Sequence, residues 1–211
     1  MNNVGITEIS FGDYLECVKQ IGTINPQERN YQYFTIEFLK KILIDTGIQV
    51  IDVSTNRNTK IHNRDHYTGD RGTPDILLAR GYQYNNNYID EASVDYIAVI
   101  EVKTPLEKMD ETKLIEHHKK QLLSHLSKNE KVILTDCITW CFFRDDKLDQ
   151  KADVLPIKSF EFRNEFYKNK RDKHKEVQKV GKRKEAFNME SDSMGSSFNE
   201  LQQYIKEFIH R

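Results

Sequence analysis

Two acids and a lysine lie at the ends of two short apolar runs. Asp75 opens the run at 76–79, and Glu101 and Lys103 close the run at 96–100. Both runs are rich in aliphatic residues and bounded by turn residues, which predicts two buried strands. Side chains alternate along a strand, so Glu101 and Lys103 point to the same face. Because like charges held close together repel, Asp75 and Glu101 would attract a cation, and their hard oxygen atoms favour Mg²⁺ or Mn²⁺.

Pro74-Asp75 followed by Glu101-Val102-Lys103 resembles the signature of the PD-(D/E)xK nuclease superfamily. The resemblance covers roughly residues 28–145 and implies a divalent metal ion held by Asp75, Glu101 and the carbonyl of Val102. Lys103 would then orient or deprotonate the attacking water and offset charge at the phosphate. The alternative is two solvated acids at the rim of an ordinary sheet, with Lys103 as a surface charge.

The resemblance also implies an acid from the first helix and a glutamine from the second. Glu28 and Glu37 are the candidate acids, and Glu28 is preferred because Glu37 has Lys41 four residues later as an ion-pair partner. A favourable acid at a helix N-terminus is the other interpretation of Glu28. Gln121, followed four residues later by His125, matches the position of the glutamine, although a solvated helix glutamine is the alternative.

The remaining pattern predicts an α/β fold with a mixed central sheet flanked by helices, in the order α-β-β-β-α-β-β of restriction-endonuclease-like proteins. Asn25-Pro26 suits a helix start, and Gly47 suits a helix end. The expected helices cover 27–45 and 108–128, and the expected strands cover 48–53, 76–79, 96–103, 131–135 and 140–143. The segment at 6–21 is left open between a strand and a short helix.

The sequence also predicts how the expected strands and helices are connected. The crossover from 96–103 through the second helix to 131–135 should be right-handed and should join parallel strands. The polar segment at 54–73 would be a loop over the site, and 81–95 would be a hairpin excursion.

Composition narrows the protein class. The chain has 211 residues, 31% of them charged, a net charge of −1, no apolar run of membrane-spanning length and no signal-peptide pattern at its N-terminus. Cys17, Cys137 and Cys141 show neither a disulfide framework nor zinc-ligand spacing. We therefore expect one core and a reducing, cytoplasmic environment, without a membrane partner.

Several histidines and arginines surround the motif. His62 and His66 lie in an expected loop and not in a helical HExxH pattern, and His117 and His118 are adjacent, so zinc catalysis has little support. Arginines that flank the motif are candidate phosphate contacts or ordinary surface charges: Arg64, Arg71 and Arg80.

The C-terminal part differs in composition from the rest. Residues 158–185 carry eleven Lys and Arg against five Asp and Glu, and 189–197 is rich in Ser. This pattern predicts a nuclease domain at 1–157 and a basic, partly flexible helical extension or linker at 158–211. Apolar residues from Phe198 onward predict a terminal amphipathic helix, which would begin a further domain, bind a partner or pack back on the same domain.

Together these features predict a Mg²⁺- or Mn²⁺-dependent endonuclease acting on double-stranded DNA. Gly72-Thr73-Pro74-Asp75, the strand that ends at Lys103 and the turn at 135–140 resemble the N-terminal nuclease domains of type I-like restriction enzymes. That resemblance implies methyltransferase or translocase domains or subunits as partners. The alternatives are a freestanding restriction enzyme, a phage or transposon nuclease, a non-catalytic nucleic-acid-binding module of the same fold, and an interaction adaptor that uses the terminal helix.

Overall fold

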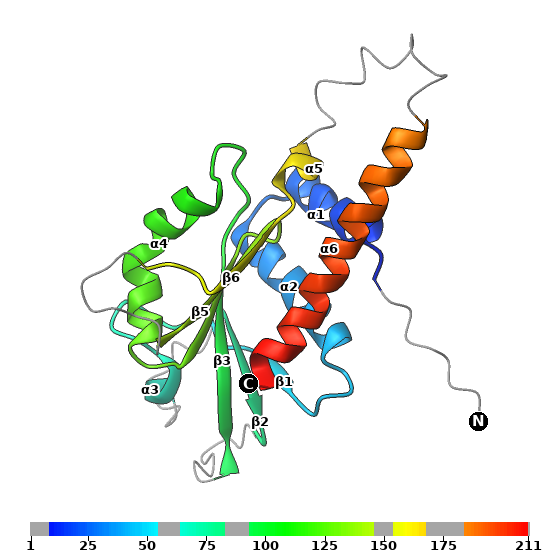
Figure 1. Ribbon diagram of the computed structural model, residues 1–211. Coiled ribbons are helices and arrows are strands. Elements are labelled where there is room, and N and C mark those ends of the chain that lie inside the picture. Colours follow the sequence, from blue (N-terminus) through cyan, green and yellow to red (C-terminus); the bar gives the residue numbers. More distant parts are fainter. Residues whose placement is uncertain (1–8, 55–63, 83–92, 146–153, 168–183, 211) are drawn as a thin grey trace, which may run out of the picture.

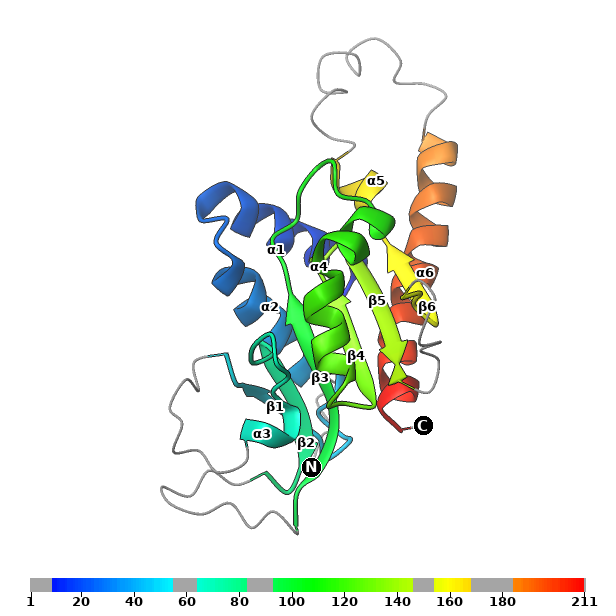
Figure 2. The ribbon, with the colours of Figure 1, turned by 90° about the vertical axis from the view of Figure 1, so that its left-hand side faces the viewer.

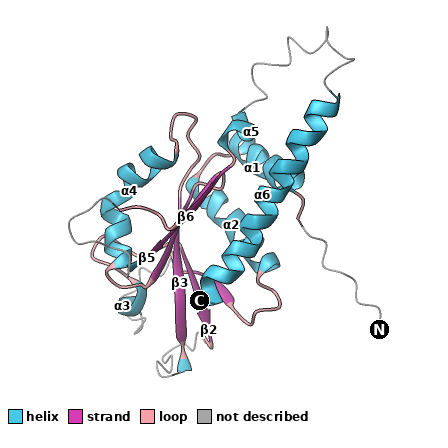
Figure 3. Ribbon diagram, viewed as in Figure 1, coloured by secondary structure: helices cyan, strands magenta, loops and turns pink. Residues whose placement is uncertain are grey.

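The computed structural model describes residues 9–54, 64–82, 93–145, 154–167 and 184–210, and describes side chains in the last range from Gly195 onward. Figure 1 shows a sheet seen nearly edge-on with helices on both sides, and Figure 3 colours the same view by secondary structure. The elements are α1 (Phe11–Ile24), α2 (Glu28–Ile42), β1 (Gln49–Asp52), α3 (Arg64–Tyr67), β2 (Ile76–Arg80), β3 (Asp95–Val102), α4 (Glu111–Leu126), β4 (Lys131–Thr135), β5 (Thr139–Arg144), β6 (Lys158–Glu161), α5 (Arg163–Tyr167) and α6 (Lys184–His210).

The described strands form one mixed six-stranded sheet in the order β1-β2-β3-β4-β5-β6. β3 and β4 are parallel, with Val99 opposite Val132, and α4 connects them, as the sequence predicts. All other neighbouring pairs are antiparallel. The expected α/β class and mixed sheet are therefore confirmed.

Each face of the sheet is covered by its own hydrophobic cluster. Helices α1, α2 and α6 cover one face, and α3 and α4 cover the other, which Figures 1 and 2 show from two directions. Alternation along β3 divides its residues accordingly: Ile100 and Val102 pack with the first cluster and Val99 with the second. Glu101 therefore faces α4, which brings its carboxylate to residues of that helix.

Local signals explain where the helices begin and end. The segment at 6–21, for which the sequence left a strand and a helix as alternatives, is helical from Phe11 onward as part of α1. The Ser10 side chain accepts the Asp13 N–H as an N-cap. Asp110 caps α4 in the same way by accepting the Lys113 N–H. The expected helix end at Gly47 is wrong, because α2 ends at Ile42 with Leu43 as its C-cap. Gly47 instead closes the turn that follows, with a φ of 69°, a left-handed conformation that glycine adopts without a steric cost.

The C-terminal part corrects two expectations. Lys158–Glu161 forms β6, which pairs with β5, so the expected boundary between 157 and 158 falls at the start of a strand of the same sheet. The Ser-rich segment expected as a flexible turn is helical, since α6 runs from Lys184 to His210 without a break. The expected basic segment lies largely outside the described residues, at 168–183.

The terminal helix packs back on the same domain. Phe198, Leu201 and Ile205 are fully buried and join the cluster on the α1/α2 face of the sheet. The centroid of the Phe198 ring lies 4.8 Å from the ring centroid of Tyr14 and 5.9 Å from that of Phe38. Burial of these large apolar side chains accounts for the position of α6, because their exposure to water would cost free energy.

The turn between β4 and β5 is held by a buried ion pair. Asp136 accepts the backbone N–H groups of Ile138 and Thr139, and Arg163 on α5 donates to its other oxygen at 2.6 Å. Cys137, inside this turn, has a φ of 68°. The 135–140 pattern therefore has a structural role that requires no chemistry.

None of the described helices combines the length and apolar character needed to cross a membrane. All three cysteines are free thiols, and Cys137 and Cys141 are buried.

Candidate active site

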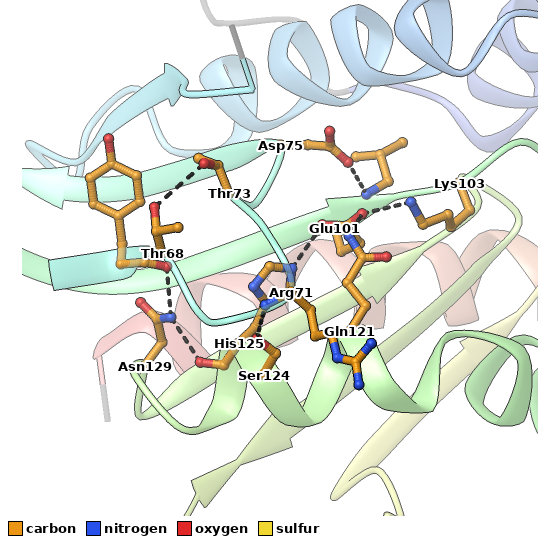
Figure 4. Close-up of polar contacts among 12 residues, drawn as sticks. Thr68, Arg71, Thr73, Asp75, Glu101, Lys103, Gln121, Ser124, His125 and Asn129 are labelled. Carbon is orange, nitrogen blue, oxygen red and sulfur yellow. Dashed lines mark hydrogen bonds and ion pairs between the residues drawn. The ribbon is translucent and has the colours of Figure 1, made fainter. Parts of the chain in front are cut away.

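The site lies where β2 begins and β3 ends. The Asp75 N–H donates to the Ile100 carbonyl at 3.1 Å, and the Asp75 carboxylate accepts the Val102 N–H at 2.8 Å. Figure 4 shows Asp75, Glu101 and Lys103 on these adjacent strands, with Gln121 and His125 reaching toward Glu101 from α4. The structure thus brings together Asp75, Glu101 and Lys103, as the motif predicts.

Glu101 is a buried carboxylate with three side-chain partners. Its Oε1 atom accepts from Lys103 Nζ and from Gln121 Nε2, both at 2.6 Å, and its Oε2 atom lies 3.0 Å from His125 Nε2. Burial alone would raise the pKa of Glu101, but the hydrogen bond with His125 and the Lys103 ammonium together hold it below its usual range. Glu101 is therefore ionised at neutral pH.

Asp75 has the opposite electrostatic environment. Burial and the nearby negative charge of Glu101 raise the pKa of Asp75 to about 7, despite the hydrogen bond from the Val102 N–H. Two neighbouring carboxylates thus differ in their affinity for a proton, an arrangement that is common where acids share a functional site.

Lys103 carries a positive charge between the acids. Its ammonium lies 2.6 Å from Glu101 Oε1 and 3.5 Å from Glu28 Oε1 at the start of α2. Burial would lower the pKa of Lys103, but the attraction of Glu101 outweighs it and raises the pKa. The solvated interpretation of this lysine is wrong, because the residue is 9% exposed.

The two candidate acids of the first helix separate clearly. Glu28 reaches Lys103, whereas Glu37 pairs with Lys40 at 2.9 Å on the exposed side of α2. Glu37 forms an ion pair, as expected, but its partner is Lys40 and not Lys41. The structure places Glu28 beside the motif and leaves Glu37 outside it.

Two residues near the motif carry roles that sequence reasoning did not assign. His125 is fully buried beneath Glu101 and contacts its carboxylate. Gln121, which was predicted, contacts the same carboxylate, so the interpretation of Gln121 as a solvated residue is wrong. Gln32 on α2 donates to the Asp75 carbonyl at 3.2 Å and to Asp52 at 3.0 Å. The spacing of four from Gln121 to His125 was the available signal for the histidine, since residues i and i+4 share a helix face.

The Val102 carbonyl also faces the site. The N–H and C=O groups of one strand residue point to the same side, and the Val102 N–H points at Asp75.

The histidines do not converge on a metal. His66 stacks on Tyr96, His117 and His118 lie in contact on α4, and His62 lies outside the described residues. Burial and the nearby Lys103 lower the pKa of His118 to about 4. No group of three or more His, Cys, Asp or Glu side chains able to hold a metal is found in the described part of the chain.

The three arginines occupy different positions. Arg80, at the far end of β2 from Asp75, pairs with Asp95 at 3.0 Å, and Arg64 Nε donates to Thr73 at 2.9 Å. Arg71 lies in a turn against α4, where its N–H donates to the Ser124 hydroxyl at 2.7 Å.

Comparison with models of known protein families finds no match, and no curated protein matches the sequence. Among solved structures, a chain from a cryo-EM structure of a DrdV–DNA complex superposes with a TM-score of 0.44 at 12% sequence identity. The match covers 72% of this chain and 12% of that chain.

Proposed function

We propose that this chain is a Mg²⁺- or Mn²⁺-dependent DNA endonuclease of the PD-(D/E)xK type, with a restriction-endonuclease-like arrangement of its sheet. The observation that carries the proposal is the convergence of Asp75, Glu101 and Lys103 at the adjoining ends of two antiparallel strands. A solvated rim of a sheet would not bury Glu101 and Lys103 together.

The donor atoms suit a hard divalent cation. Asp75 and Glu101 contribute carboxylate oxygens, and Val102 contributes a carbonyl on the side of its strand that faces Asp75. A set of oxygen atoms with few protein ligands is typical of Mg²⁺, which retains waters and takes phosphate oxygens from its substrate. When bound, such an ion would make a coordinated water more acidic and neutralise charge on the phosphate.

The protein side chains of the site have different proposed roles. Lys103 is held in its ammonium form by Glu101 and Glu28, which favours orientation of a water and stabilisation of negative charge over abstraction of a proton. Gln121 and His125 fix the Glu101 carboxylate from α4. Asp75, with its raised pKa, must lose its proton before it can serve as a ligand.

The proposed substrate is double-stranded DNA, and the proposed context is the nuclease domain or subunit of a cytoplasmic restriction-modification system, with methyltransferase or translocase partners. This context follows from the resemblance of the motif to type I-like restriction enzymes. A phage or transposon nuclease would use the same residues and the same chemistry.

Plasmid cleavage tests the proposal. The purified chain should nick or linearise supercoiled plasmid with Mg²⁺ or Mn²⁺, should bind DNA without cutting it in Ca²⁺, and should be inactive in EDTA. Lys103→Met should abolish cutting, whereas the exposed control Lys40→Met should cut like the wild type, with both variants showing wild-type circular dichroism. Metal-independent DNA binding without cutting under any of these conditions would instead indicate a non-catalytic nucleic-acid-binding module.

A further inference from the structure

The segment that leads into Asp75 contains a tight turn built on two glycines. Gly69 and Gly72 pair as an isolated bridge, with the Gly72 N–H donating to the Gly69 carbonyl at 3.2 Å. Gly72 has a φ of 128°, a conformation that side chains disfavour. Arg71 therefore lies within this turn, four residues before Asp75, the first acid of the motif.

This turn is fixed to α4 by close contacts. A Cβ atom on Gly69 would overlap the carbonyl oxygen and the hydroxyl of Ser124, so the backbone approaches the helix as only glycine permits. The Ser124 hydroxyl accepts the Arg71 N–H at 2.7 Å, and the Asn129 side chain donates to the Tyr67 carbonyl at 3.1 Å. The turn and the helix that holds Glu101 thus form one positioned unit.

The Arg71 side chain extends from the Gly69–Gly72 turn into solvent. It is exposed, and its guanidinium makes no hydrogen bond or ion pair with any residue that the structure describes, in contrast to Arg64 and Arg80. Figure 4 shows it extending along α4 past Ser124 in the direction of Gln121. Ser124 and Gln121 are three residues apart, which is about 4.5 Å along a helix axis. The guanidinium therefore extends toward Gln121, which donates to Glu101.

We propose that Arg71 binds a backbone phosphate of the DNA strand next to the bond that is cut, and that the Gly69–Gly72 turn exists to hold it there. This inference rests on the proposed nuclease function and deepens it. A guanidinium fork matches phosphate oxygens, and a fixed backbone reduces the ordering that binding requires.

DNA binding in Ca²⁺ separates this proposal from the nuclease assignment. We would measure fluorescence anisotropy of a labelled 30-base-pair duplex over a range of salt concentrations for the wild type, Arg71→Gln and the matched control Arg80→Gln. Arg71→Gln should weaken binding about tenfold and reduce the slope of log affinity against log salt by about one, because one phosphate contact is lost. Arg80→Gln should leave both quantities unchanged.

A double-mutant cycle tests the role of the turn. Ser124→Ala removes the acceptor of the Arg71 N–H and should weaken binding in the wild-type background but not in the Arg71→Gln background. Equal affinities and slopes for Arg71→Gln and Arg80→Gln would overturn the proposal, even if the wild type cuts DNA. A wild type that binds DNA in Ca²⁺ but never cuts would overturn the nuclease assignment. The comparison of Arg71→Gln with Arg80→Gln would then still decide whether Arg71 contacts a phosphate. A wild type that does not bind DNA would overturn both.

Discussion

His125 lies fully buried beneath Glu101, with its Nε2 atom 3.0 Å from the Oε2 atom of the carboxylate. The other oxygen of Glu101 takes the Lys103 and Gln121 donors, so the three partners together satisfy a charge that burial would otherwise disfavour. The second helix therefore contributes to the electrostatics of the site as directly as the strands do.

Removal of the His125 ring should destabilise the protein and weaken the site together. We expect His125→Ala to lower the free energy of unfolding by about 2–4 kcal/mol, because it leaves a cavity and removes a partner of a buried charge. Cleavage should then require more Mg²⁺. Chemical denaturation and a metal titration of single-turnover cleavage measure these effects, with His117→Ala on the exposed side of α4 as the control. Wild-type values for His125→Ala in both assays would show that the contact with Glu101 has no consequence.

Glu28 and Glu37 allow a matched comparison on one helix. Glu28→Gln weakens the hold on the Lys103 ammonium and should reduce the cleavage rate about tenfold or more, while stability changes by less than about 0.5 kcal/mol because the side chain is half-exposed. Glu37→Gln should alter neither quantity, since its partner is the exposed Lys40. Kinetics of both variants on one plasmid substrate measure the difference, and a reversed order would move the helix acid to Glu37.

The raised pKa of Asp75 predicts a pH dependence of stability in metal-free protein. The folded state retains a proton on Asp75 up to about pH 7, whereas the unfolded chain releases it at lower pH. The stability due to this proton is present in acid and is lost as the pH rises through about 7. Wild type should therefore lose stability relative to Asp75→Asn between about pH 4 and pH 7, and the difference should stay constant above that range.

Thermal unfolding in EDTA at several pH values measures this difference. One pKa unit corresponds to about 1.4 kcal/mol, which is enough to move Tm by several degrees. Addition of Mg²⁺ above pH 7 should stabilise the wild type but not Asp75→Asn. Parallel pH profiles for the two proteins would mean that Asp75 titrates in its ordinary range.

The terminal helix should be part of the folding unit. Phe198 is fully buried against Tyr14, Phe38 and Phe162, so Phe198→Ala should cost about 3–5 kcal/mol. Asn199→Ala, on the exposed side of α6, should change stability by less than about 0.5 kcal/mol. Denaturant unfolding compares them. Removal of residues 198–211 should yield an unfolded or aggregated chain, and a soluble, cooperatively folded truncation would show that α6 is a separable extension.

The local parts of this fold follow from the sequence because their causes lie within a few residues. Short aliphatic runs bounded by turns predict β2, β3 and β4, and Lys131–Thr135 has the expected bounds. Alternation along β3 alone places Glu101 and Lys103 on one face, and Gly47 adopts a left-handed conformation, although α2 itself ends earlier, at Ile42.

The tertiary structure decided which distant residues meet. Glu101 gains His125 and Gln121 only because α4 crosses that face of the sheet, and Lys103 meets Glu28 only because α2 begins at the same edge. Amphipathic spacing predicted α6 but left its partner open, since an apolar stripe does not specify the surface that covers it. The proton affinity of Asp75 likewise depends on burial and on Glu101, two effects that exist only after the strands have paired and water has been excluded.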